Sequence, residues 1–205
     1  MHLNKNLFSL KQSFFTQQSI GERDILVVIL DINDIKEFLS NIICSRKTAI
    51  AFVGSPLRKD DRIALLIYHD LLNKLKNNLD DVWFIECEYG LENCLHEIIK
   101  KKPEVLIIVD AILSQELRPG EIVLVSWEHV KEKIGLATTH NIPVYITLSL
   151  LRKQVDLQEI YLLGIRVENI EIGMDISESV NKGRKKIIDL FLKVITGCKG
   201  RKILA

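Results

Sequence analysis

The order of apolar and polar positions along the chain predicts alternating strands and helices. Three apolar runs are typical of buried strands: TAIAFV at 48–53, EVLIIVDA at 104–111 and EIYLLGIRV at 159–167. Between such runs, stretches such as 61–76 repeat apolar residues every three or four positions, as amphipathic helices do. Unbroken apolar strands that alternate with helices indicate a parallel sheet covered on both faces.

The same patterns place the remaining elements. Helices are expected at 33–47, 61–76, 91–102, 142–154 and 175–196, with a short one at 129–134, and further strands at 24–32, 82–86 and within 118–127. We therefore predict an α/β fold, a three-layer α/β/α sandwich around a mostly parallel twisted sheet. Residues 1–46 are expected to form an N-terminal extension that could add a strand and a helix, and residues 47–198 the α/β domain.

Polar residues occur where the predicted parallel strands end. Asp61 follows the 48–53 strand, Asp110 ends the 104–110 strand, and His140 lies in a polar loop with the sequence ATTHNIP. Ligands of open α/β sheets collect beyond the carboxyl ends of the strands. Two carboxylates and an imidazole there could bind a borderline divalent metal and leave positions open for a substrate.

Each of these residues also has a simpler explanation. Asp60 or Asp61 could cap the first turn of the following helix, although one carboxylate is enough for that. Asp110 could accept hydrogen bonds from a neighbouring loop, and His140 could be an ordinary polar loop residue. From spacing alone the metal site is one interpretation among several.

Composition narrows the function only slightly. A net charge of +1 gives no reason to expect nucleic acid or an anionic membrane as a partner, and no apolar run approaches the length that spans a bilayer. We expect neither nucleic-acid binding nor membrane insertion. The four cysteines form no CxxC pair and no signal peptide is evident, so they are expected to be reduced thiols in a cytoplasmic protein. The motifs GxSxG, HExxH and GxxxxGK[ST] do not occur.

Five segments resemble a known family when taken together. GSPLRKDD, LIIVDA, RPGEI, TTHNIP and YLLGI occur in the order and spacing of the hydrogenase maturation endopeptidases. These proteases remove the C-terminal tail of [NiFe]-hydrogenase large subunits. The resemblance covers residues 48–196, and the TTHNIP segment is similar to the branch that processes formate-hydrogenlyase-type and energy-converting hydrogenases.

The resemblance implies a fold, a substrate and a site. The family has an α/β/α sandwich, uses no nucleophilic serine or cysteine, and acts on a precursor that already contains nickel. Its acidic first-loop residue, its Asp after a strand and its THN histidine match Asp61, Asp110 and His140, which are thereby expected to be the catalytic and metal-contacting residues. The metal would be the nickel of the precursor, or another divalent metal at the same site. Asp60 would support the loop or the helix terminus.

The chain departs from the family at several glycines. The family usually has GN where this chain has Gly54 followed by serine, and DDGxG where this chain has DDRIA with Arg62 at the glycine. The glycine-rich loop after the second strand retains only Gly90. Glycines permit close approach of a substrate backbone, so Gly54, Arg62 and Gly90 are the candidate substrate-binding residues.

Three functions are compatible with these features. The first is a peptidase that trims a nickel-loaded hydrogenase large-subunit precursor. The second is a non-catalytic assembly factor that binds the same precursor without cutting it; the altered glycines favour it and the intact trio argues against it. The third is an unrelated small-molecule hydrolase of similar sheet topology. The sequence does not choose among precursors.

Overall fold

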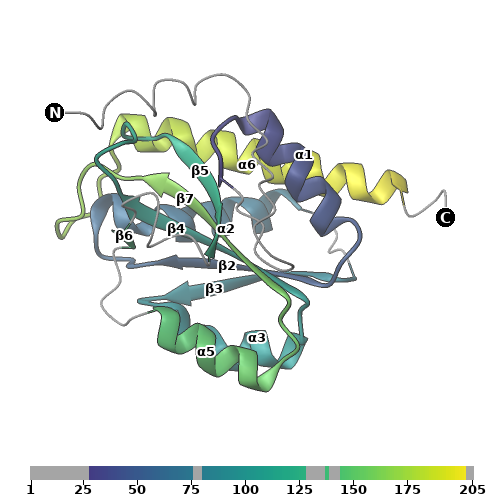
Figure 1. Cartoon of the computed structure of the whole chain (residues 1–205). Coiled ribbons are helices and arrows are strands. Elements are labelled where there is room, and N and C mark those ends of the chain that lie inside the picture. Colours follow the sequence, from purple (N-terminus) through teal and green to yellow (C-terminus); the bar gives the residue numbers. More distant parts are fainter. Residues whose placement is uncertain (1–27, 76–79, 128–136, 139–143, 202–205) are drawn as a thin grey trace, which may run out of the picture.

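The structure of the chain, a computed structural model, describes residues 28–75, 80–127, 137–138 and 144–201 (Figure 1). Its strands are β1 (Val28–Ile29), β2 (Thr48–Gly54), β3 (Val82–Glu88), β4 (Val105–Leu113), β5 (Ile122–Ser126), β6 (Ala137–Thr138) and β7 (Glu159–Arg166). Its α-helices are α1 (Ile32–Ile43), α2 (Ile63–Lys74), α3 (Leu95–Lys101), α5 (Val144–Gln154) and α6 (Glu178–Arg201), and its 3-10 helices are η2 (Lys59–Arg62) and η3 (Leu91–Cys94).

The strands form a mixed sheet in the order β1-β5-β7-β4-β2-β3, and β6 pairs with β4 off this path. The central strands β7, β4, β2 and β3 are parallel. Antiparallel pairs are confined to β1 with β5, β5 with β7, and β6 with β4. Within the described residues, no helix is both long and apolar enough to cross a membrane.

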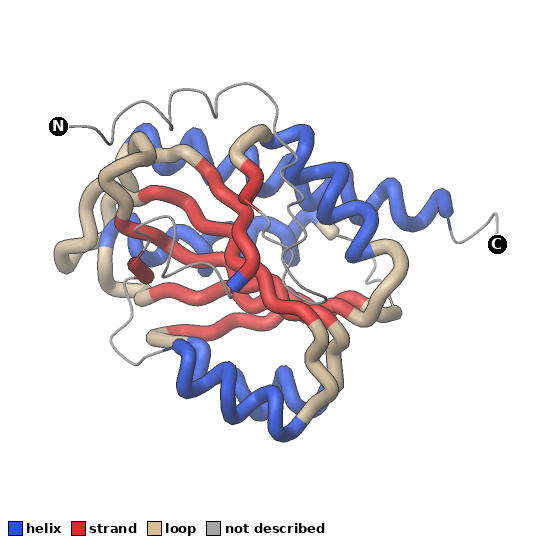
Figure 2. The backbone as a smooth tube through the Cα atoms, viewed as in Figure 1, coloured by secondary structure: helices blue, strands red, loops and turns tan. Residues whose placement is uncertain are grey.

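Helices cover both faces of the sheet (Figures 1 and 2). Alternate residues of β4 belong to two separate cores, as the two-residue period of a strand requires: Val105, Ile107 and Val109 pack with α1, α2 and α6, whereas Leu106 and Ile108 pack with the α3 and α5 side. The predicted three-layer α/β/α sandwich is confirmed.

Most predicted elements are present, with shifted ends. The helix expected from residue 61 begins as the 3-10 helix η2 and becomes α2 only at Ile63. The first helix, expected from residue 33, begins at Ile32 and is capped by Asp31, whose carboxylate accepts from the Asn33 and Asp34 amides. The predicted elements at 129–134, and the parts of those at 24–32 and 142–154 that precede Val28 and Val144, lie outside the described residues.

The first strand and helix are packed onto the sheet layer. β1 forms the edge of the sheet and pairs with β5, with Val28 opposite Val125. Helix α1 packs against α6, and Ile35 and Leu39 of α1 are fully buried there. These parts of the predicted extension at 1–46 therefore share the main core.

All four cysteines are paired, which corrects the expectation of reduced thiols. Cys44 is bonded to Cys198, and Cys87 to Cys94. The first pair joins residues 154 positions apart and forms because α1 packs on α6. Spacing along the sequence gave no sign of it, since proximity there is created only by the packing of two helices.

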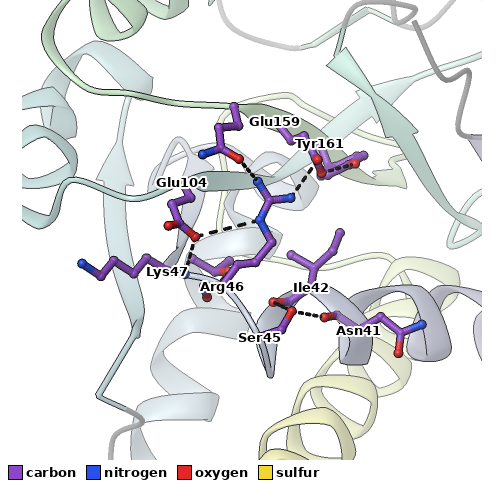
Figure 3. A network of polar contacts seen from close by, with 10 residues as sticks. Asn41, Ile42, Ser45, Arg46, Lys47, Glu104, Glu159 and Tyr161 are labelled. Atoms are coloured by element: carbon purple, nitrogen blue, oxygen red, sulfur yellow. Dashed lines mark hydrogen bonds and ion pairs between the residues drawn. The ribbon is translucent and has the colours of Figure 1, made fainter. Parts of the chain in front are cut away.

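A polar network lies at the amino-terminal ends of the parallel strands (Figure 3). Arg46, just before β2, contacts Glu159 of β7 at 2.7 Å and donates to Gln158 at 2.8 Å. Glu159 also accepts a hydrogen bond from the Tyr161 hydroxyl at 2.6 Å. The network ties β2 to β7 across the intervening β4, far from the edge where the predicted site lies.

Candidate functional site

The connections that leave β2 and β4 run toward opposite edges of the sheet. From β2 the chain passes through α2 to β3, whereas from β4 it passes beyond β7 to β5. Two adjacent parallel strands whose connections diverge in this way leave a crevice at their carboxyl ends, the usual ligand position in an open α/β sheet. Asp61 follows β2 and Asp110 belongs to β4, so both candidate carboxylates flank this switch point.

Asp110 lies inside β4, which corrects the expectation that it ends the strand. The strand continues to Leu113 because β7 and β6 both pair with it beyond Asp110. Pairing with β2, in contrast, stops at Phe52 opposite Val109, so Asp110 is the first residue beyond that ladder. Its side chain is buried and one carboxylate oxygen accepts from the Ala111 amide at 2.8 Å.

Asp61 lies in η2, which packs directly against β4. Its side chain is only 2% exposed. Gly54, the last residue of β2, makes this approach possible, because a Cβ there would lie 2.6 Å from the Asp61 carbonyl oxygen. Gly54 thus has a packing role; its predicted contact with substrate stays a prediction.

Asp60 is fully buried and faces the loop between β7 and α6. Its carboxylate accepts hydrogen bonds from the Glu168, Asn169 and Ser177 amides and from the Ser177 hydroxyl. Asp60 was expected to support its own loop or the helix terminus, and its hydrogen bonds show that it supports the loop between β7 and α6. The partners, however, are more than a hundred positions away and were not foreseen.

Arg62 and Lys59 face the same loop. The Arg62 guanidinium donates to the Met174 carbonyl at 3.4 Å and lies 3.1 Å from its sulfur. Lys59 pairs with Glu171 at 2.9 Å, and this hydrogen bond and charge hold the pKa of the Glu171 carboxyl below its usual value. Contact of Arg62 with a substrate stays a prediction.

A disulfide closes the loop that follows β3. Cys87 and Cys94 bracket Tyr89 and Gly90, which have φ values of 64° and 150°. The Tyr89 amide donates to the Gly54 carbonyl at 2.8 Å, so this loop abuts the loop that carries Asp61. Glycine has no Cβ, so it adopts the positive φ at position 90 without steric cost. Contact of Gly90 with substrate stays a prediction.

His140 lies outside the described residues, so its position relative to the two carboxylates stays a prediction. The strand just before it is described: β6 pairs antiparallel with β4, with Thr138 opposite Ile112. His140 is two residues after Thr138, and Asp110 is two residues before Ile112. Among the described residues, no group of three or more His, Cys, Asp or Glu side chains forms a metal cluster.

Sequence reasoning missed the β7–α6 loop. Asn169 and Ser177 take part in fixing η2, yet both stand in a polar stretch without a recognisable motif. The available signal was the second acidic residue of the Asp60–Asp61 pair. Because one carboxylate is enough to cap a helix, the second indicated a further binding partner, which the sequence did not identify.

Comparisons with known proteins agree with this architecture. A family model described as hydrogenase maturation protease (HycI) matches residues 71–194. The crystal structure of the [NiFe] hydrogenase maturation protease HycI from Thermococcus kodakarensis KOD1 is similar with a TM-score of 0.64 and 21% identity, covering 78% of this chain and 99% of that one. No curated protein matches the chain.

Two further solved structures have the same fold. The [NiFe] hydrogenase maturation protease HybD from Thermococcus kodakarensis is 26% identical, with a TM-score of 0.60 over 72% of this chain and 98% of that one. The hydrogenase maturating endopeptidase HybD from E. coli is 22% identical, with a TM-score of 0.60 over 74% of this chain and 93% of that one.

Proposed function

The chain belongs to the hydrogenase maturation protease family, and we propose that it removes the C-terminal extension of a nickel-loaded [NiFe]-hydrogenase large-subunit precursor. The observation that supports this most is the burial of Asp61 and Asp110 on either side of the switch point, where a ligand of such a sheet binds. In this proposal the nickel belongs to the substrate and the protein supplies side chains that contact it.

The donor chemistry fits a divalent ion. Carboxylate oxygens and imidazole nitrogens are suitable ligands for borderline divalent metals. Asp61 and Asp110 provide two carboxylates, and the pairing of Thr138 with Ile112 brings the chain close to Asp110 shortly before His140. We propose that these three residues contact the nickel of the precursor or another divalent metal at the same site.

The cysteines argue against thiol chemistry. Cysteine proteases need a thiolate nucleophile, and all four cysteines of this chain are in disulfides. A carbonyl polarised by the substrate's metal and attacked by water is the simplest alternative. The residues of the protein would then bind and orient the precursor and keep its cleavage site beside the ion.

The partner proposed here is the large-subunit precursor, and the place of action is the cytoplasm. Cytoplasmic disulfides are uncommon in mesophiles but frequent in hyperthermophiles. The two disulfides are therefore compatible with this location only in a cell that keeps them oxidised.

The deciding experiment is incubation of the full chain with a nickel-loaded precursor, followed by mass measurement of the large subunit. Loss of a C-terminal peptide, and no loss with the Asp61→Asn variant or with nickel-free precursor, is the result expected. A stable complex whose precursor keeps its full mass would overturn the protease proposal in favour of an assembly factor. Absence of both binding and cleavage would exclude that precursor as the partner.

A further inference from the structure

We propose that Asp60 is a positioning residue, which fixes Asp61 at the carboxyl edge of the sheet by tying η2 to the β7–α6 loop. The proposal rests on the proposed function, because Asp61 is expected there to contact the substrate's metal. Asp60 itself would touch neither substrate nor metal.

The Asp60 carboxylate is saturated by one loop. Its Oδ2 accepts from the Glu168 amide at 3.0 Å, the Asn169 amide at 2.9 Å and the Ser177 hydroxyl at 2.8 Å, and its Oδ1 accepts from the Ser177 amide at 2.7 Å. Hydrogen bonds to an ionised acceptor are about twice as strong as neutral ones, and this carboxylate is 0% exposed. Four such bonds define its position closely.

Backbone contacts join the same two segments at Asp60 and at the residues just before it. The Asp60 amide donates to the Asn169 carbonyl at 3.0 Å, and the Gly173 amide donates to the Leu57 carbonyl at 3.0 Å. Arg58 and Ile172 form an isolated antiparallel bridge. The first loop and the β7–α6 loop are thus held together as one unit.

The element that carries Asp61 needs this external support. η2 has only four residues, and no side chain caps its start. Short 3-10 helices have poor hydrogen-bond geometry of their own, so their position depends on what they bind. The Asp60 carboxylate supplies four hydrogen bonds of this external support.

Fixing Asp60 also fixes the direction of its neighbour. Successive residues of a 3-10 helix are about 120° apart around its axis, so a carboxylate locked on the loop leaves Asp61 to point elsewhere. On the other side, the close contact between Gly54 and the Asp61 carbonyl limits movement toward β2. Asp61 is therefore held between the end of β2 and the β7–α6 loop.

The test compares three variants of the full chain. Asp60→Asn keeps the size of the side chain but presents an amide group to amide donors, and Ser177→Ala removes only the hydroxyl contact. Glu171→Gln is the matched control, because it weakens the ion pair between Lys59 of η2 and the exposed Glu171 of the same loop without touching Asp60. Each is assayed for kcat and KM of peptide release from nickel-loaded precursor.

A positioning role predicts an effect on turnover. A displacement of about 1 Å at a reacting centre can lower the rate about 100-fold, so we expect Asp60→Asn to lower kcat by about that factor with KM nearly unchanged. Ser177→Ala should lower kcat less, and Glu171→Gln should leave both constants unchanged. An unchanged kcat in Asp60→Asn, or a loss confined to KM, would overturn the proposal.

Crystal structures of the wild type and the variants separate this proposal from the proposed function. If the wild-type chain releases no peptide, the proposed function fails. The positioning role of Asp60 can still be tested in that case, by the position of Asp61 relative to β4. A displaced Asp61 in Asp60→Asn supports the positioning role, and an Asp61 in its wild-type position refutes it. If Asp60→Asn does not fold, the same comparison is made with Ser177→Ala.

Discussion

Cys44, the residue directly after α1, is bonded to Cys198 near the end of α6. The bond joins the end of α1 to α6, across a sequence separation of 154 residues. A second bond, between Cys87 and Cys94, closes a separation of only seven residues beside the candidate site. The two bonds therefore constrain the unfolded chain to very different degrees.

Removing the two disulfides should reveal this difference. In the chain-entropy description the longer loop contributes about 5 kcal/mol and the shorter about 2.5 kcal/mol. We expect the Cys44→Ser/Cys198→Ser double variant to lower the free energy of unfolding more than Cys87→Ser/Cys94→Ser does, as measured by chemical denaturation. Equal losses, or insensitivity of the wild type to a dithiol reductant, would contradict the pairing seen in the structure.

Replacing either buried carboxylate should abolish peptide release. Asp61→Asn and Asp110→Asn each remove one negative charge from the proposed metal contact while keeping the side-chain volume. We expect loss of processing, measured by the mass of the precursor, together with a folded protein in circular dichroism. Cleavage at the wild-type rate by either variant would remove that residue from the site. Asp175→Asn, an exposed aspartate in the β7–α6 loop, is a suitable control.

His140 offers a test that separates function from stability. We expect His140→Ala to abolish processing and to leave the melting temperature nearly unchanged, because the proposed role of His140 is contact with the metal and not packing in the core. Both quantities are measured on the same preparation, the first by mass spectrometry and the second by calorimetry. If the alanine variant processes the precursor normally, the predicted trio is reduced to two carboxylates.

The Arg46 network should matter for stability and not for turnover. The Arg46 side chain is 22% exposed and its partner Glu159 is 42% exposed, so the pair lies between a surface and a buried salt bridge. We expect Arg46→Ala to lower the free energy of unfolding by about 1.5 kcal/mol, with kcat unchanged because the network is at the amino-terminal edge of the strands.

The control for Arg46 is an exposed pair elsewhere. Lys193→Ala breaks the Lys193–Asp189 pair on the surface of α6, whose side chains are 59% and 61% exposed. Its effect on the free energy of unfolding should be below ~0.5 kcal/mol. Similar effects of the two substitutions would show that the network adds nothing beyond an ordinary surface ion pair.

The sequence alone determined the elements and the class of fold. Apolar periodicity acts within a few residues, so it identified β2, β4 and β7 as buried strands and the amphipathic helices between them. The helix expected at 91–102 is present as η3 and α3 and ends at Lys101, with Lys102 in a left-handed conformation with φ of 49°. The positions of Asp61 and Asp110 near the carboxyl ends of β2 and β4 followed from the same pattern.

Tertiary structure decided which distant residues meet. The continuation of β4 past Asp110 depends on β6 and β7, the pairing of Cys44 with Cys198 depends on the packing of α1 on α6, and the saturation of Asp60 depends on a loop more than a hundred residues away. No local pattern records such contacts, because they arise only when separate elements are packed around one sheet. Asp61, Asp110 and His140 could be proposed as site residues from the sequence, whereas the hydrogen bonds of Asp60 to the β7–α6 loop became visible only in the folded chain.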